Sequence, residues 1–161
     1  MSEQAQSDQI NKFFEDYVRT FDERDGAAIS MFYHVPSLTM RADMSTHCFQ
    51  SREEVATFFQ AVSDSYAREG NEGGRFRNLV VQSIGARSAL ATLEWQLMRL
   101  DGTVVREWRQ SYNVIRPDDR WQIFVSTIHL KGDQSIGAGA VTRMLGSGMS
   151  PIGTTRTWRD V

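Results

Sequence analysis

The stretch LEWQLMRLDGTVVREWRQSY, residues 93–112, predicts a β-hairpin and constrains the fold more than any other segment. Asp101 and Gly102 at its centre are a strong signal for a two-residue turn, because a type I′ turn needs positive φ at both central positions. Pairing Leu100 with Thr103 then fixes the register along both strands. The chain around this turn therefore forms part of an antiparallel sheet.

The hairpin register sorts the two strands into an apolar and a polar face. Trp95 pairs with Trp108 on the apolar face, whereas Glu94 pairs with Arg109 on the polar face, where we expect an ion pair across the strands. Each large aromatic side chain buries on the order of 150–250 Å². We therefore predict that both indole rings point inward, where they either fill the core or line a cavity.

A second turn, RPDDRW over residues 116–121, adds a further strand to this sheet. Pairing its first residue with its last places Gln110 beside Thr127 and Trp108 beside His129 on the inward face. A slip of one residue in this register would exchange the two faces of the last strand.

The amino-terminal half shows helical periodicity instead. Apolar residues recur at helical spacing over residues 8–24 and again over 51–70, where Ser51 and Glu54 form a capping box. Asp25 caps a short helix between these two. Extended segments of alternating polarity are expected at residues 37–49, 76–84, 88–100, 103–116 and 121–130.

Three helices and a long antiparallel meander predict an α+β fold. The residues from Lys131 onward hold six of the twelve glycines and only one aromatic residue. We therefore expect a single domain over residues 1–130 and a glycine-rich tail or arm over residues 131–161.

Composition excludes several classes of function. A net charge of −2 gives no broad positive field for nucleic acid or an anionic membrane. Cys48 is the only cysteine, which rules out an internal disulfide, and we expect it to be a buried, inert thiol. Neither an apolar run of about 18 residues nor a basic, apolar leader is present, so we expect a cytoplasmic protein.

The order of elements over residues 8–130, with the strand texts ALATLEWQLMRLDGTVVREWRQSY and RWQIFVSTIH, resembles the nuclear transport factor 2-like superfamily. Within it, the chain is most similar to uncharacterised bacterial proteins of the SnoaL-like branch, which includes polyketide cyclases and ketosteroid isomerase-like proteins. The resemblance implies a cone-shaped, barrel-like fold, in which a strongly curved sheet wraps three amino-terminal helices. It also implies a pocket at the open end of the cone and homodimers joined through the outer sheet face.

Several residues are candidates for a site in that pocket. His129 is a candidate general base or acid, because imidazole titrates near neutral pH, although a strand-end histidine also simply bonds to a neighbour. Gln110 and Thr127 either orient a ligand or satisfy each other. Trp95 and Trp108 are candidates to stack on a ring.

Tyr112 joins the ligand-binding set, since the predicted register places it near the two tryptophans on the inward face. The resemblance adds two further candidates. Tyr17 lies on the helix where ketosteroid isomerases carry an oxyanion-binding tyrosine, and Asp43 lies in the region of their basic carboxylate. A tyrosine in such a position is more often simply a core aromatic residue whose hydroxyl is hydrogen-bonded. The inward strand positions near Trp95 offer no second acid of the kind those isomerases use.

We expect neither a metal nor a cofactor. His34, His47 and His129 are the only histidines, and no pair has the i, i+4 spacing of a helical metal site. The possible partners that remain are a second copy of the chain and a small hydrophobic ligand.

Two functions remain open. In the first, the protein is a cofactor-independent cyclase, isomerase or dehydratase that moves a proton on a hydrophobic ring-containing substrate. In the second, it is a non-catalytic dimeric module that binds a ligand or a protein. A cavity of about 300 Å³ or more, with His129 and Gln110 exposed to it, would favour the enzyme. A solidly packed inner face would exclude the enzyme.

Overall fold

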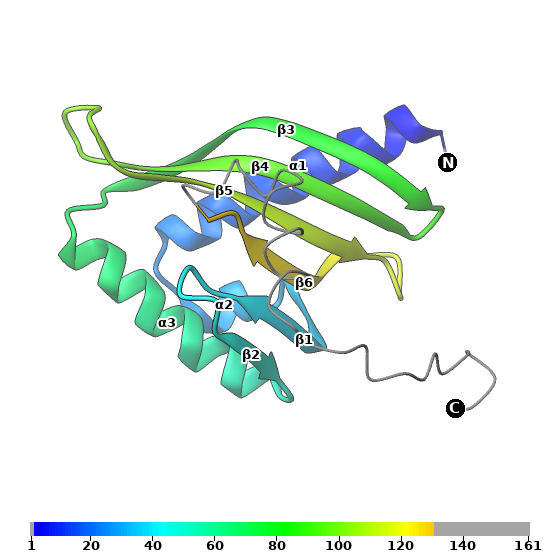
Figure 1. Ribbon diagram of the computed structural model, residues 1–161, viewed down its shortest axis with the longest axis horizontal. Coiled ribbons are helices and arrows are strands. Elements are labelled where there is room, and N and C mark those ends of the chain that lie inside the picture. Colours follow the sequence, from blue (N-terminus) through cyan, green and yellow to red (C-terminus); the bar gives the residue numbers. More distant parts are fainter. Residues whose placement is uncertain (1, 131–161) are drawn as a thin grey trace, which may run out of the picture. The chain divides into compact units, whose positions relative to one another are not determined.

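The structure of the protein is a computed structural model that describes residues 2–130 (Figure 1). Three helices and one mostly antiparallel sheet make up this part of the chain, which confirms the predicted α+β class. In chain order the elements are α1 (Glu3–Asp22), α2 (Gly26–Ser30), β1 (Tyr33–Met40), β2 (Thr46–Phe49), α3 (Arg52–Arg68), β3 (Gly73–Gly85), β4 (Ser88–Met98), β5 (Val104–Ile115) and β6 (Gln122–Ile128).

The six strands form one sheet in the order β2-β1-β6-β5-β4-β3. All neighbours are antiparallel except β1 and β6, which run parallel. Figure 1 shows the sheet bending from the long strands β3 to β5 towards the short strands β1 and β2. The predicted tail, residues 131–161, lies outside the described residues.

Helix α1 supplies one side of the core. It begins earlier than the periodicity predicted, because the Ser2 hydroxyl accepts a hydrogen bond from the backbone N–H of Ala5 and caps the first turn. Ile10, Phe14 and Tyr17 are buried along one face of the helix. Phe14 packs against the rings of Trp95 and Tyr112 on the inner face of the sheet, so this stripe closes the core.

The caps predicted for the other two helices are confirmed. Asp25 accepts from the Ala28 N–H at 3.0 Å, and Ser51 accepts from the Glu54 N–H at 3.2 Å. Helix α2 packs directly on α3 at Gly26, where an added Cβ would lie 2.4 Å from a backbone oxygen of α3. The absence of a side chain at Gly26 therefore permits the close approach of the two helices.

The register predicted between β4 and β5 is confirmed over most of its length. Trp95 faces Trp108, and both lie on the face that meets the helices. The turn itself differs from a type I′ turn, since of its two central residues only Gly102 has positive φ. A register shift between Leu97 and Met98 accommodates the longer turn, which leaves the pairing of the tryptophans unchanged.

The register predicted between β5 and β6 is correct only at the start of β6. Val114 pairs with Ile123 as expected, but the register then shifts by one residue between Asn113 and Val114. Beyond this bulge, Gln110 pairs with Ile128 and not with Thr127. Since side chains alternate along a strand, the shift turns every later side chain of β6 to the opposite face.

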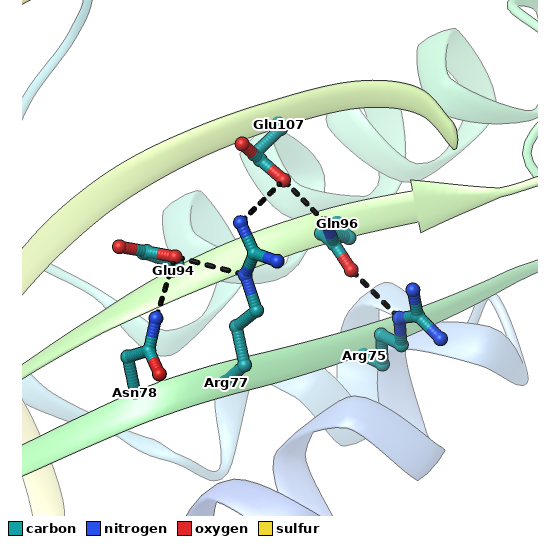
Figure 2. A network of polar contacts seen from close by, with 6 residues as sticks. All are labelled: Arg75, Arg77, Asn78, Glu94, Gln96 and Glu107. Atoms are coloured by element: carbon teal, nitrogen blue, oxygen red, sulfur yellow. Dashed lines mark hydrogen bonds and ion pairs between the residues drawn. The ribbon is translucent and has the colours of Figure 1, made fainter.

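The outer face of the sheet carries a polar network across β3, β4 and β5 (Figure 2). Arg77 bridges Glu94 at 2.9 Å and Glu107 at 3.1 Å, and Asn78 donates a second hydrogen bond to Glu94 at 2.9 Å. Gln96 links Glu107 to Arg75 in the same network. The predicted ion pair of Glu94 with Arg109 is wrong, because β3 supplies the cation although the two residues are register partners.

Cys48 is also on this outer face and is exposed, so the expectation of a buried thiol is wrong. Its partner in β1 is the outward residue Leu38, and alternation along the short strand β2 directs Phe49 into the core in its place. Within residues 2–130, no helix is both long and apolar enough to cross a bilayer.

Candidate functional site

A cavity of about 740 Å³ lies between the inner face of the sheet and helices α1 and α3. Its volume is within the range of small-molecule sites, which are typically about 300–1,000 Å³. Aromatic side chains from both layers form much of its wall. The principal ones are Tyr17, Tyr33, Phe59, Trp95, Trp108 and Tyr112.

The two indole N–H groups are fixed by internal hydrogen bonds. Trp95 donates to the hydroxyl of Tyr112 at 2.8 Å, and Trp108 donates to the side-chain carbonyl of Gln110 at 3.0 Å. The ring centroids of Trp95 and Trp108 are 6.5 Å apart, within reach of each other. These bonds hold both rings in defined orientations on the cavity wall.

A pair of buried hydroxyls forms another polar group on the wall. The hydroxyl oxygens of Tyr17 and Tyr33 are 2.8 Å apart, and both side chains are almost completely buried. Burial raises the pKa of Tyr17, Tyr33 and Tyr112 well above the ordinary tyrosine value. All three hydroxyls are therefore neutral at physiological pH.

Exposed and half-buried charged side chains surround these buried groups, and we call this set the rim: Asp22, Arg41, Asp43, Arg68, Glu69 and Arg106. Arg106 forms an ion pair with Glu69 at 2.9 Å and lies over the ring of Tyr66. Arg41 lies over the ring of Phe58 at 5.8 Å. The cavity is thus apolar and aromatic inside and charged where it meets solvent.

Two carboxylates of the rim differ in their surroundings. Partial burial raises the pKa of Asp22, against the opposing effects of a hydrogen bond from the Gly74 N–H and of the nearby Arg24. By contrast, hydrogen bonds from the Ser45 side chain and backbone lower the pKa of the exposed Asp43. Asp22 is consequently the better proton acceptor near neutral pH.

Sequence reasoning missed Asp22. It follows the apolar stripe of α1 by one position, and a charged residue at the end of a helix carries no distinguishing pattern. Its place on the rim depends on β3 beginning at Gly73, in a segment that reads as a loop in the sequence, so no local signal identifies it.

The structure brings most of the candidate residues together. Tyr17, Trp95, Trp108, Gln110 and Tyr112 all line the cavity, and Asp43 lies on its rim.

Thr127 and His129 are placed differently, because the bulge in the β5–β6 pairing turns both side chains to the outer face. There the His129 ring bonds to the Ser111 hydroxyl at 2.7 Å, while burial and the neighbouring Arg109 lower its pKa. The predicted inward placement of both residues is therefore wrong. Ser126 and Ile128 take the inward positions and line the cavity.

The other histidines are also apart from the cavity wall. His34 bonds to the carbonyl oxygen of Pro36, and His47 stacks on Phe58. Over the described range 2–130, no three His, Cys, Asp or Glu side chains gather in a way that could hold a metal ion.

This arrangement suits a neutral ring compound. Aromatic walls offer stacking surface, and the buried hydroxyl and amide groups offer hydrogen bonds in surroundings of low polarity, where such bonds are strong. The rim carboxylates are the groups that can exchange a proton with a bound molecule.

The sequence also matches a known protein family. The family described as NTF2-like protein (DUF6841) matches residues 6–131. No curated protein matches the sequence.

Solved structures share the fold at low sequence identity. Aln2 from a Streptomyces species has a TM-score of 0.67 at 11% identity, covering 89% of this chain and 98% of its own. An NTF2-like protein with a cystatin-like fold from Novosphingobium aromaticivorans has a TM-score of 0.63 at 16% identity, covering 86% and 87%. A domain of unknown function with a cystatin-like fold from Nostoc punctiforme has a TM-score of 0.62 at 17% identity, covering 90% and 94%.

Proposed function

This chain belongs to the NTF2-like protein family DUF6841, and we propose that its cavity binds a hydrophobic, ring-containing small molecule. The single observation that carries the proposal is the 740 Å³ cavity, walled by aromatic rings whose polar atoms are held by internal hydrogen bonds. A core built only for stability would close such a space, because protein interiors pack to the density of organic crystals.

The proposal includes membership of the SnoaL-like branch and a bacterial source. The support is the residue pattern of the central strands, in which two tryptophans are paired across a hairpin and point to the helices. Aln2, which comes from Streptomyces, shares the fold.

The chemistry proposed for a bound substrate is proton transfer without a cofactor, as in a cyclase, isomerase or dehydratase. Asp22 or Asp43 would take the proton at the rim, and the raised pKa of Asp22 favours it for this step. Tyr17 or Gln110 would stabilise the oxygen that gains negative charge, since preorganised donors are effective where water is excluded.

A second candidate function is binding without catalysis. The observation in its favour is that the innermost polar groups of the cavity are tyrosines whose pKa is raised far from neutrality, together with an uncharged amide. Such a wall binds and orients a ligand, and catalysis then depends entirely on the carboxylates of the rim.

Tryptophan fluorescence tests the cavity. Titration with fluorene, an aromatic hydrocarbon, should quench the protein emission through Trp95 and Trp108 on the cavity wall. Trp108→Ala should weaken fluorene binding or lower the free energy of unfolding by about 3–5 kcal/mol.

Trp121→Phe is the matched control, because Trp121 lies apart from the cavity wall and donates to Gln9. This variant should keep the affinity of the unaltered chain. Saturating fluorene without any change in emission would refute a ring-binding cavity.

A further inference from the structure

Two buried side chains of the cavity wall, Tyr112 and Gln110, carry protons that have no acceptor in the described chain. The Tyr112 hydroxyl accepts from Trp95, and its own proton has no acceptor among the residues that the structure describes. Gln110 shows the same pattern, since its carbonyl accepts from Trp108 whereas its NH₂ group has no acceptor within residues 2–130. Both side chains are more than nine-tenths buried.

Each hydroxyl pair on the wall also leaves one proton unused. In the pair of Tyr17 with Tyr33, one hydroxyl donates to the other, so one proton is left for a further acceptor. The hydroxyls of Thr39 and Ser126 are also hydrogen-bonded to each other, at 2.5 Å, and leave one more. The wall therefore offers protons from four places, and at two of them, Tyr112 and Gln110, the oxygen of the same side chain already accepts from an indole N–H.

Such donors are costly when buried and unpaired, at about 1–3 kcal/mol each, and water or a ligand must meet them. The raised pKa of the three tyrosines keeps these protons in place, so the wall is neutral. A ligand amine would bring further donors to the unpaired protons of Tyr112 and Gln110. A ligand carboxylate would bring a charge that no buried cation neutralises, since the cavity arginines lie on the rim.

We propose that the ligand of this cavity is an uncharged ring compound that carries acceptor oxygens, of the aryl ketone or quinone type, and that Tyr112 and Gln110 donate hydrogen bonds to them. This inference rests on the proposed function and narrows it to one class of ligand. The ring stacks on the aromatic walls, and the carbonyl oxygen selects its orientation.

The experiment compares two probes of the same shape, 9-fluorenone and fluorene, which differ by one carbonyl oxygen. Dissociation constants are measured by tryptophan fluorescence for the unaltered chain and for Tyr112→Phe and Gln110→Leu. Each variant removes the donor group of one side chain, together with the acceptor of the Trp95 or the Trp108 N–H. Thr92→Val is the matched control, because it removes a hydroxyl from the outer face of the same sheet, where Thr92 bonds to Ser111. Infrared spectra report the carbonyl stretch of bound fluorenone.

Fluorenone should bind more tightly than fluorene by roughly three- to tenfold for each hydrogen bond formed. At least one of the two donor variants should lose that preference, and Thr92→Val should retain the affinities of the unaltered chain for both probes. The carbonyl stretch should lie at lower frequency in the complex and move back in the same variant.

Equal affinities for the two probes in the unaltered chain would overturn the inference and leave the ring-binding function standing. A preference that survives in both donor variants would also overturn it. Failure of both probes to bind would instead refute the proposed function and the inference with it.

Discussion

At the scale of single residues, hydrogen bonds between side chains of different elements hold the polar groups of the cavity wall. Tyr17 of α1 meets Tyr33 of β1, and Trp95 of β4 meets Tyr112 of β5. Each bond satisfies a polar atom that is removed from water, so its loss costs more than its formation gains. Because of these hydrogen bonds, tyrosine hydroxyls and an indole N–H can lie in the aromatic core, on the wall of the cavity.

The Tyr17–Tyr33 bond gives a direct test by a double-mutant cycle. Tyr17→Phe and Tyr33→Phe should each lower the free energy of unfolding by about 1–3 kcal/mol, because each leaves one buried hydroxyl without its partner. The double variant should lose less than the sum of the two, since no unpaired hydroxyl then remains. Urea denaturation measures all four proteins, and strictly additive losses would contradict the bond.

The raised pKa of Asp22 predicts an effect of pH on the free energy of unfolding. Its pKa is raised in the folded chain by partial burial, so the folded state holds this proton more tightly than the unfolded state does. The free energy of unfolding should therefore fall as pH rises from the ordinary Asp value through the raised one. Asp22→Asn, which keeps an oxygen for the Gly74 N–H, should be more stable than the unaltered chain at pH 7 and should lose this advantage below about pH 4.

Asp101 is the matched control for that measurement. Hydrogen bonds from the Thr103 side chain and backbone lower its pKa, which gives the opposite sign. Its ionised form stabilises the fold above the ordinary Asp value, and this contribution is lost as pH falls. Asp101→Asn should therefore destabilise the chain at pH 7, and stability curves that move in the same direction for both variants would contradict the account.

At the scale of elements, the sequence predicted the helices, the strands and one of the two long registers. The caps at Asp25 and Ser51 are local, and the hairpin of β4 and β5 has a short turn, so nearby residues suffice to determine them. The pairing of β5 with β6 could not be predicted from its turn alone. A bulge opposite Asn113 and Val114, where Phe124 of β6 has no partner in β5, changes the register by one residue, and the turn residues carry no signal for it.

This register shift explains the wrong placement of Thr127 and His129 in the candidate site. Thr127 and His129 lie outside the cavity and Ser126 lies on its wall, whereas the candidate residues on β4 and β5 lie where they were predicted. Asp22 was missed because its role depends on contact between distant elements. Alternating polarity thus predicts which face of a strand is apolar, but it does not predict an irregular pairing.

The contact of α2 with α3 predicts unequal effects of two similar substitutions. Gly26→Ala would place a Cβ 2.4 Å from the Ala56 backbone oxygen and 2.8 Å from Gln60, so the helices must separate. We expect a loss of about 1–3 kcal/mol or more in the free energy of unfolding. Gly85→Ala is the matched control, since nothing lies within 4 Å of its added Cβ. Thermal denaturation should show a lower midpoint for the first variant only, and equal midpoints would contradict the close packing.

At the scale of the whole molecule, the described domain has two faces with different chemistry. The inner face of the sheet encloses the cavity, and the outer face carries the network of Figure 2 together with exposed apolar side chains such as Leu38, Val80 and Leu90. The homodimer through this outer face, which the family resemblance implies, stays a prediction. Sedimentation velocity would measure it, with a monomer at micromolar concentration as the contrary result.

We have proposed that the paired indoles of Trp95 and Trp108 line an open cavity and that this cavity binds a ring compound. The most direct measurement is a crystal structure of the protein soaked with 2-bromofluorene, in which the anomalous signal of bromine locates the ligand. We predict a bromine peak inside the cavity, with the ring in contact with Tyr17, Trp95 or Trp108. A saturating soak that gives a peak only on the outer face of the sheet, or none at all, would contradict it.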